Sequence, residues 1–153
     1  MLNNDILRRL RYTFDLKDSK MIALFEKGGL ATTREEVSNW LKREEDAAFV
    51  RCTDLTLAHF LNGLIVDRRG AKEGQPAIAE QRLDNNLILR KLKIALELKT
   101  DDMLETMEAG GLQVSPHELS AFFRRAHHQH YLVCEDQILR NFMRGLQLRF
   151  RPD

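Results

Sequence analysis

The sequence predicts an all-α protein made by tandem duplication of a four-helix unit of about 70 residues. The first observation is an internal repeat: NNDILRRLR at residues 3–11 returns 82 positions later as NNLILRKLK at residues 85–93. A register kept without a gap from residue 3 to residue 70 indicates duplication. The second observation is that apolar residues recur every three or four positions, whereas no alternating strand pattern of useful length is present.

The repeat sets the expected boundaries of the parts of the chain. Residues 1–70 are expected to form the first helical repeat and residues 83–153 the second, with residues 71–82 as a linker that contains Gly74 and Pro76. A unit of this size with four short helices is marginally stable alone. We therefore expect the two halves to pack with pseudo-twofold symmetry around a shared core.

The first two helices of each repeat are expected to start and stop at recognisable residues. The first begins after a capping asparagine, Asn4 or Asn86. The second stops at a Gly-Gly pair, where glycine tolerates the left-handed C-cap conformation. Their expected core positions are Ile6, Leu7, Leu10 and Phe14, then Met21, Ile22 and Phe25, matched in the second repeat by Ile88, Leu89, Leu92 and Leu96, then Met103, Leu104 and Met107.

The third and fourth helices carry equally clear start signals. The third opens with a capping box at Thr33 or Ser115, and Pro116 suits the first helical position. The fourth follows Asp54 or Asp136, whose charge suits the positive end of a helix. Their expected core positions are Val37, Trp40 and Leu41, then Leu57, Phe60, Leu61 and Leu64, matched by Leu119, Phe122 and Phe123, then Leu139, Phe142, Met143 and Leu146.

A glycine recurs inside the fourth helix, as Gly63 and Gly145. Glycine at such a position costs about 1 kcal/mol relative to alanine. We therefore expect another backbone to pass close by, belonging either to the other copy or to a partner protein.

Charge and composition exclude several function classes. The chain has 24 basic and 23 acidic side chains, and the balance is also near zero within each repeat. Neither half is therefore a strongly basic nucleic-acid module. No apolar run is long enough to span a bilayer, no secretory signal is visible, and two cysteines make a reduced cytoplasmic setting the expectation.

Polar residues retained in both copies are candidates for binding. Arginine pairs well with carboxylate or phosphate because its planar fork can donate two parallel hydrogen bonds. The same side chains could instead form ion pairs between helices or hydrogen bonds to chain ends. The binding candidates are the retained pairs Arg8 and Arg90, Arg43 and Arg125, and Lys17 and Lys99, together with Arg124.

Metal or thiol chemistry has one weak candidate, the cluster of His127, His128, His130 and Cys134. Zinc requires about four such ligands with converging geometry. The matching stretch of the first repeat lacks histidine, so a solvated loop is the favoured interpretation and no metal or other cofactor is expected. Cys52 and Cys134 each precede a helix, a position that can lower the pKa of a thiol, but a small apolar packing role is favoured.

The second and third helices of each repeat have features of a helix-turn-helix, around residues 18–43 and 100–125. Residues 37–40, VSNW, resemble the Val-Ser-x-Trp start of recognition helices in repressor-type domains, although the turn is longer than in those domains. The candidate nucleic-acid contacts are Arg34, Asn39, Lys42 and His117, together with Arg124 and Arg125. Acidic neighbours in the first repeat oppose this interpretation.

Strings along nearly the whole chain resemble the YehS-like family, small bacterial proteins with a duplicated domain of unknown function. The strings lie at residues 2–5, 40–42, 60–65, 88–96, 117–124 and 136–142. The resemblance implies a bacterial cytoplasmic protein and brings no activity, substrate or catalytic residue.

The leading functional hypothesis is a non-catalytic helical interaction protein, regulatory or adaptor-like, that binds another macromolecule. A protein partner is favoured over DNA or RNA, and no membrane partner is expected. Nucleic-acid binding through the third helices is the alternative. A metal- or thiol-dependent enzyme at residues 127–134 is third, because no phosphate loop, nucleophile elbow or HExxH motif is present.

Overall fold

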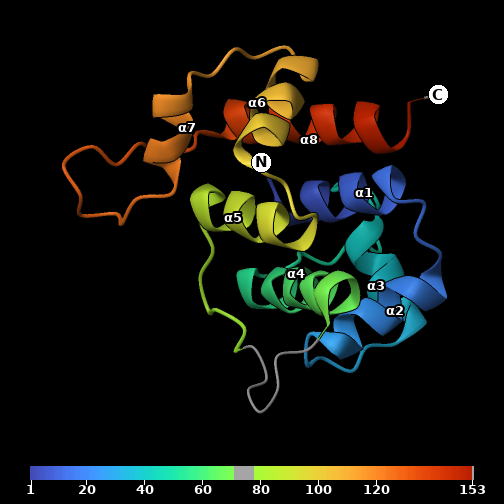
Figure 1. Cartoon of the computed structure of the whole chain (residues 1–153). Helices are drawn as coiled ribbons and strands as arrows, with labels where there is room; N and C mark the ends of the chain where they lie inside the picture. Colours follow the sequence, from blue (N-terminus) through green and yellow to red (C-terminus); the bar gives the residue numbers. More distant parts are fainter. Residues whose placement is uncertain (71–77, 153) are drawn as a thin grey trace. The chain divides into compact units, whose positions relative to one another are not determined.

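A computed structural model describes residues 1–70 and 78–152, and within them the chain forms eight α-helices and no strand (Figure 1). The chain divides into two compact units, Met1–Leu83 and Asp84–Asp153. The all-α class and the duplicated unit are confirmed. Residues 71–77 of the predicted linker lie outside the described residues, and the shared pseudo-twofold core remains a prediction.

Each unit has four helices in the same order. The first unit contains α1 (Asn3–Thr13), α2 (Asp18–Lys27), α3 (Arg34–Leu41) and α4 (Asp54–Arg69). The second contains α5 (Asn85–Ala95), α6 (Thr100–Ala109), α7 (Pro116–Phe122) and α8 (Asp136–Phe150). The main helix pair is α2 with α4 in the first unit and α6 with α8 in the second, and α3 or α7 packs on one side of it (Figure 1).

The apolar stripes predicted for the eight helices supply the buried core. Phe25 lies at the centre of the first unit, with its ring centroid 5.2 Å from that of Trp40 and 5.1 Å from that of Phe60. Six of the predicted core residues are only half-buried, and they occupy matching positions in the two units: Phe14, Ile22 and Leu41, then Leu96, Leu104 and Phe123. None of the described helices combines the length and apolar character needed to cross a bilayer.

Glycine lets the two main helices of each unit approach until their backbones touch. A Cβ atom added at Gly63 would lie far under 3.0 Å from the carbonyl oxygen of Leu24 in α2, and one at Gly145 would meet that of Thr106 in α6 in the same way. The predicted close approach is confirmed, but both predicted sources of the second backbone were wrong. It belongs to the second helix of the same unit.

The asparagines expected to cap the first helices are core residues instead. The caps are Leu2 and Asp84, and Asn4 is completely buried within α1. Asn4 Nδ2 donates to the carbonyl oxygens of Trp40 (2.8 Å) and Val50 (2.9 Å), and its Oδ1 accepts from the amide of Cys52 (3.0 Å). Asn86 makes the three equivalent bonds, at 3.0, 2.9 and 2.9 Å. The side chain therefore fixes the loop between the third and fourth helices, which explains why it recurs.

The capping boxes of the third helices are confirmed. The hydroxyl of Thr33 accepts from the amide of Glu36, and Glu36 Oε1 accepts from the amide of Thr33. Ser115 and Glu118 repeat both bonds, with proline at the first position of α7. The capping residues in the local sequence were therefore sufficient to predict where the third helices begin.

An ion pair joins the main helices of each unit with its charges exchanged. In the first unit, Lys20 Nζ of α2 lies 2.8 Å from Asp67 Oδ1 of α4. In the second, the matching residues are Asp102 of α6 and Arg149 of α8, 3.4 Å apart. Hydrogen bonds from Lys20 and Lys27 lower the pKa of Asp67, and the backbone amide of Lys99, followed by Arg149, lowers the pKa of Asp102.

Candidate functional site

The arginines retained at the first helices have a defined contact within their own units. Arg8 Nη1 donates to the carbonyl oxygen of Lys42 at 2.8 Å, and its Nη2 pairs with Asp5. Arg90 Nη2 donates to the carbonyl oxygen of Phe123 at 2.6 Å. Both side chains thus satisfy carbonyl groups at the end of the third helix, where a helix leaves acceptors unpaired. This contact accounts for their recurrence, and their assignment as binding residues remains a prediction.

The other binding candidates are spread along the chain rather than gathered in one place. Arg43 and Arg125 are exposed in the loops that follow α3 and α7, with Arg124 half-exposed beside the latter. Lys17 and Lys99 occupy the N-cap positions of α2 and α6. Of the predicted binding residues, only Lys17 lies in the depression described below.

The two cysteines have environments that oppose thiol chemistry. Cys52 and Cys134 are only 2% and 1% exposed. Burial, followed by the nearby charge of Asp54 or Asp136, raises the pKa of each thiol to about 12. Burial and the raised pKa both oppose a reactive role and agree with the favoured packing role of these side chains.

The histidine cluster does not assemble a metal site. His127, His128 and His130 lie in an exposed turn, whereas Cys134 is buried. His128 Nδ1 accepts the amide of His130 at 3.0 Å, which uses one ring nitrogen within the turn. Across residues 1–70 and 78–152, no group of three or more histidine, cysteine or acidic side chains has the arrangement to hold a metal ion. The three histidines and Cys134 therefore do not come together as metal ligands in this part of the chain.

The candidate nucleic-acid contacts fall on different parts of the third helices. Arg34 is the first residue of α3, and His117 is exposed on α7. Asn39 is half-buried and accepts the amide of Val50 at its carbonyl oxygen, while Lys42 Nζ donates to Ser38 Oγ at 3.1 Å. Only Arg34 joins another candidate, Lys17, at a common site.

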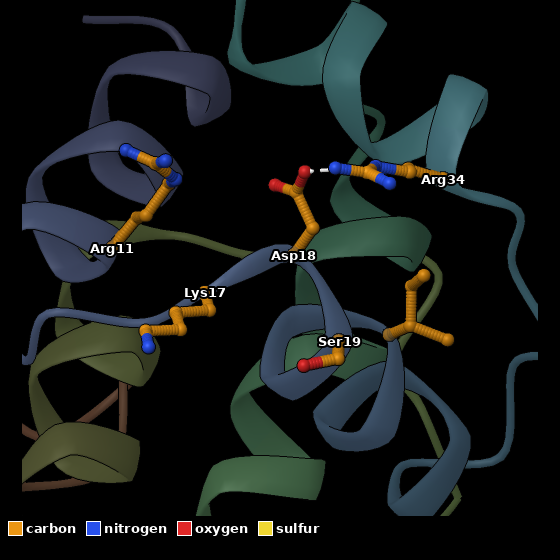
Figure 2. A pocket seen from close by; sticks show the side chains of 6 residues that line it. Arg11, Lys17, Asp18, Ser19 and Arg34 are labelled. Carbon is orange, nitrogen blue, oxygen red and sulfur yellow. Dashed lines mark hydrogen bonds and ion pairs between the residues drawn. The ribbon is translucent and has the colours of Figure 1, made fainter.

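That site is an open depression of about 580 Å³ at the start of α2. Figure 2 shows Asp18 between Arg11 and Arg34, with Lys17 and Ser19 beside it. These five side chains are joined by a sixth lining residue, Ile22. Three cations and one carboxylate therefore line the depression, which gives its lining a formal net charge of +2, although the Lys17 amine points away from the Asp18 carboxylate (Figure 2).

The one ion pair within the depression is weak. Arg34 Nε lies 3.1 Å from Asp18 Oδ2, and the two side chains are 80% and 36% exposed. Exposed pairs of this kind contribute about 0–1 kcal/mol. The guanidinium of Arg34 can therefore exchange this partner for a ligand at little cost.

The backbone adds positive potential at the same place. The N-cap of α2 is Lys17, and no side chain caps the helix there. The unpaired amides at a helix start carry about half a positive charge and attract anions. The depression is thus suited to hold an anionic group by side chains and backbone together.

Sequence reasoning found two of the lining cations and missed Arg11. Lys17 was found because it recurs as Lys99, and Arg34 because of its place at the start of α3. Arg11 becomes Lys93 in the second repeat, so a search for identical residues passed over it. Comparing charge rather than identity between the copies would have identified Arg11, whose charge is kept in Lys93, and Arg34, whose charge is lost in Pro116.

Comparisons with known proteins agree with the duplicated structure. A family model described as protein of unknown function (DUF1456) matches residues 3–70 and again residues 85–151. The chain is 41% identical over 150 residues to the uncharacterized protein YehS of Escherichia coli (strain K12), covering 97% of this chain and 96% of that protein. No solved structure gives a significant match. The resemblance drawn from the sequence strings is confirmed.

Proposed function

The chain belongs to the family of unknown function DUF1456, and from that premise we propose that it is a non-catalytic interaction protein that binds an anionic segment of a protein partner. The binding site is the basic depression of the first unit. The observation that carries this function is that Arg11, Lys17 and Arg34 line one depression at the uncapped start of α2.

Differences between the two repeats support this site. Asn4 and Arg8, which recur in the second repeat, serve contacts within their own unit. The depression is not repeated in this way, because the position of Arg34 is occupied by Pro116 in the second unit and that of Ser19 by Asp101. Lys17 recurs as Lys99 and Arg11 keeps its charge as Lys93, so the features that the first unit has alone are Arg34 and the absence of an acid at position 19.

The composition of the lining favours a protein partner over nucleic acid. None of the six lining residues is aromatic, so the depression offers no ring on which a base could stack. The first repeat has 12 basic and 11 acidic side chains, which gives no general attraction to a polyanion. A short anionic segment needs only local positive charge.

Site-specific crosslinking in the native host tests the function. A photo-crosslinking amino acid is placed at Ile22 in the depression of the full chain, and at Leu104, the matching position of α6, as control. We expect a protein adduct at position 22 that survives nuclease treatment. An adduct lost on nuclease treatment indicates nucleic acid, and equal labelling at both positions removes the depression as the interface.

A charge-matched pair of triple variants separates the site from general electrostatics. In the position 22 background, R11S/K17S/R34S removes three exposed cations from the depression. The control K99S/R125S/R144S removes three exposed cations from the second unit. We expect only the first set to abolish the adduct, and loss in both would contradict a specific site.

A further inference from the structure

The two units use the acid at the start of the second helix differently: Asp102 accepts a backbone amide at the start of α6, whereas Asp18 in the first turn of α2 pairs with Arg34. Asp102 Oδ2 accepts the amide of Lys99 at 2.9 Å, so a carboxylate occupies the start of α6. The matching residue of the first unit is Lys20, whose Nζ donates to Asp67 Oδ1 of α4. The start of α2 therefore has cations nearby and no side chain on its amides.

The charges around the depression set the charge of the group that would neutralise it. Arg11, Lys17 and Arg34 contribute three positive charges and Asp18 one negative charge. A phosphate monoester carries about −1.5 to −2 at pH 7 with three acceptor oxygens, whereas a carboxylate or a phosphodiester carries one negative charge. The monoester matches the net charge of +2 and offers enough oxygens for two guanidinium groups and the helix amides.

We infer that the group bound in this depression is a phosphate monoester on a protein segment, a phosphorylated serine or threonine. This inference rests on the proposed function and specifies its ligand. The phosphate lies between Arg11 and Arg34, whose side chains stand on either side of Asp18 (Figure 2). Lys17 adds a third cation to the lining, and the amides at the start of α2, which no side chain caps, donate to the phosphate oxygens. A phosphorylated nucleic-acid end has the same charge, but its base would find no aromatic side chain in the lining.

Amide chemical shifts of the ¹⁵N-labelled full chain test the inference with defined probes at constant ionic strength. The probes are N-acetyl-phosphoserine amide, its unphosphorylated form, N-acetyl-glutamate amide and a 5′-phosphorylated oligonucleotide. We expect saturable shifts at residues 17–20, with the phosphoserine probe binding at least tenfold more tightly than the glutamate probe. Equal binding of these two, or tighter binding of the oligonucleotide, would overturn the inference.

A substitution copied from the second unit separates a loss of binding from a loss of stability. Ser19→Asp installs in α2 the acid that Asp101 provides in α6. An acidic residue in the first turn favours the helix, so we expect an unchanged or higher Tm together with at least a tenfold loss of phosphoserine binding. Ser120→Asp, at an exposed serine of α7, is the matched control and leaves binding unchanged. Full binding by Ser19→Asp would overturn the inference.

The two sets of experiments fail independently. If a crosslink forms at Ile22 but the chain shows no preference for phosphoserine, the interaction function is retained and a phosphate monoester is excluded as the ligand. Absence of both the crosslink and the site-specific shifts removes the proposed function and the inference together.

Discussion

Asn4→Asp distinguishes a core asparagine from a helix cap. Asparagine and aspartate are about equally good N-caps, so a capping role predicts almost no change in stability. In the core, the substituted carboxylate would keep the bond from the amide of Cys52 but could not donate to the carbonyl oxygens of Trp40 and Val50. The two roles therefore predict different free energies of unfolding.

The size of the effect follows from the two lost donors. Each buried carbonyl left without a partner costs about 1–3 kcal/mol, so the substitution should cost about 2–6 kcal/mol. A negative charge placed against two carbonyl oxygens in a fully buried position acts in the same direction. Because a domain is stable by only about 5–15 kcal/mol, such a loss is readily measured.

Urea unfolding followed by circular dichroism at 222 nm provides the measurement. Asn86→Asp repeats the test in the second unit, where the same three bonds are present. Ser115→Asp is the control, because Ser115 is a true N-cap and aspartate should replace it within about 0.5 kcal/mol. A change below about 1 kcal/mol for Asn4→Asp would refute the core role.

Three further predictions follow from the contacts described above. Gly63→Ala should lower the free energy of unfolding by about 1–3 kcal/mol, because the added Cβ would overlap a carbonyl of α2 and force the two helices apart. The gain in helix propensity of about 1 kcal/mol does not offset this cost. Equal or higher stability by urea titration would contradict the close backbone contact. Cys52 and Cys134 should resist a thiol reagent in native protein at pH 8 and react after unfolding. Because burial raises the pKa of each thiol from 9.0 to about 12, the contribution of the two thiols to the free energy of unfolding is present below pH 9 and is lost as pH rises toward 12. Rapid native labelling would contradict this. Arg8→Ala should cost about 1–2 kcal/mol through its lost bond to a carbonyl, whereas Arg125→Ala, in an exposed loop, should stay within about 0.5 kcal/mol; equal effects on Tm would contradict the structural role of Arg8.

Local sequence was sufficient for the helices and most of the core. The capping boxes at Thr33 and Ser115 and the proline at the start of α7 depend on neighbours within one turn. The stripe ending in Leu64 depends only on helical spacing, and that residue is buried as predicted. Such features need no knowledge of what the helices pack against.

Long-range partners explain what the sequence left undetermined. Asn4 stands near a helix start and has the composition of a cap, but its partners lie 36 to 48 residues away. Gly63 predicted that another backbone lies close to the fourth helix, but the sequence did not indicate that this backbone belongs to α2 of the same unit. The depression joins Arg11, from α1, to Lys17 and Arg34, so it exists only once three helices are placed.

The exchanged ion pairs have a consequence for how a duplicated chain finds its fold. Two homologous units offer each second helix two fourth helices of similar shape, a setting in which tandem repeats exchange elements and misassemble. Pairing α2 with α8 would bring Lys20 against Arg149, and pairing α6 with α4 would bring Asp102 against Asp67. The two incorrect helix pairings place like charges together, whereas the two correct pairings place opposite charges together. The exchange of charge signs between the units therefore favours pairing of each second helix with the fourth helix of its own unit.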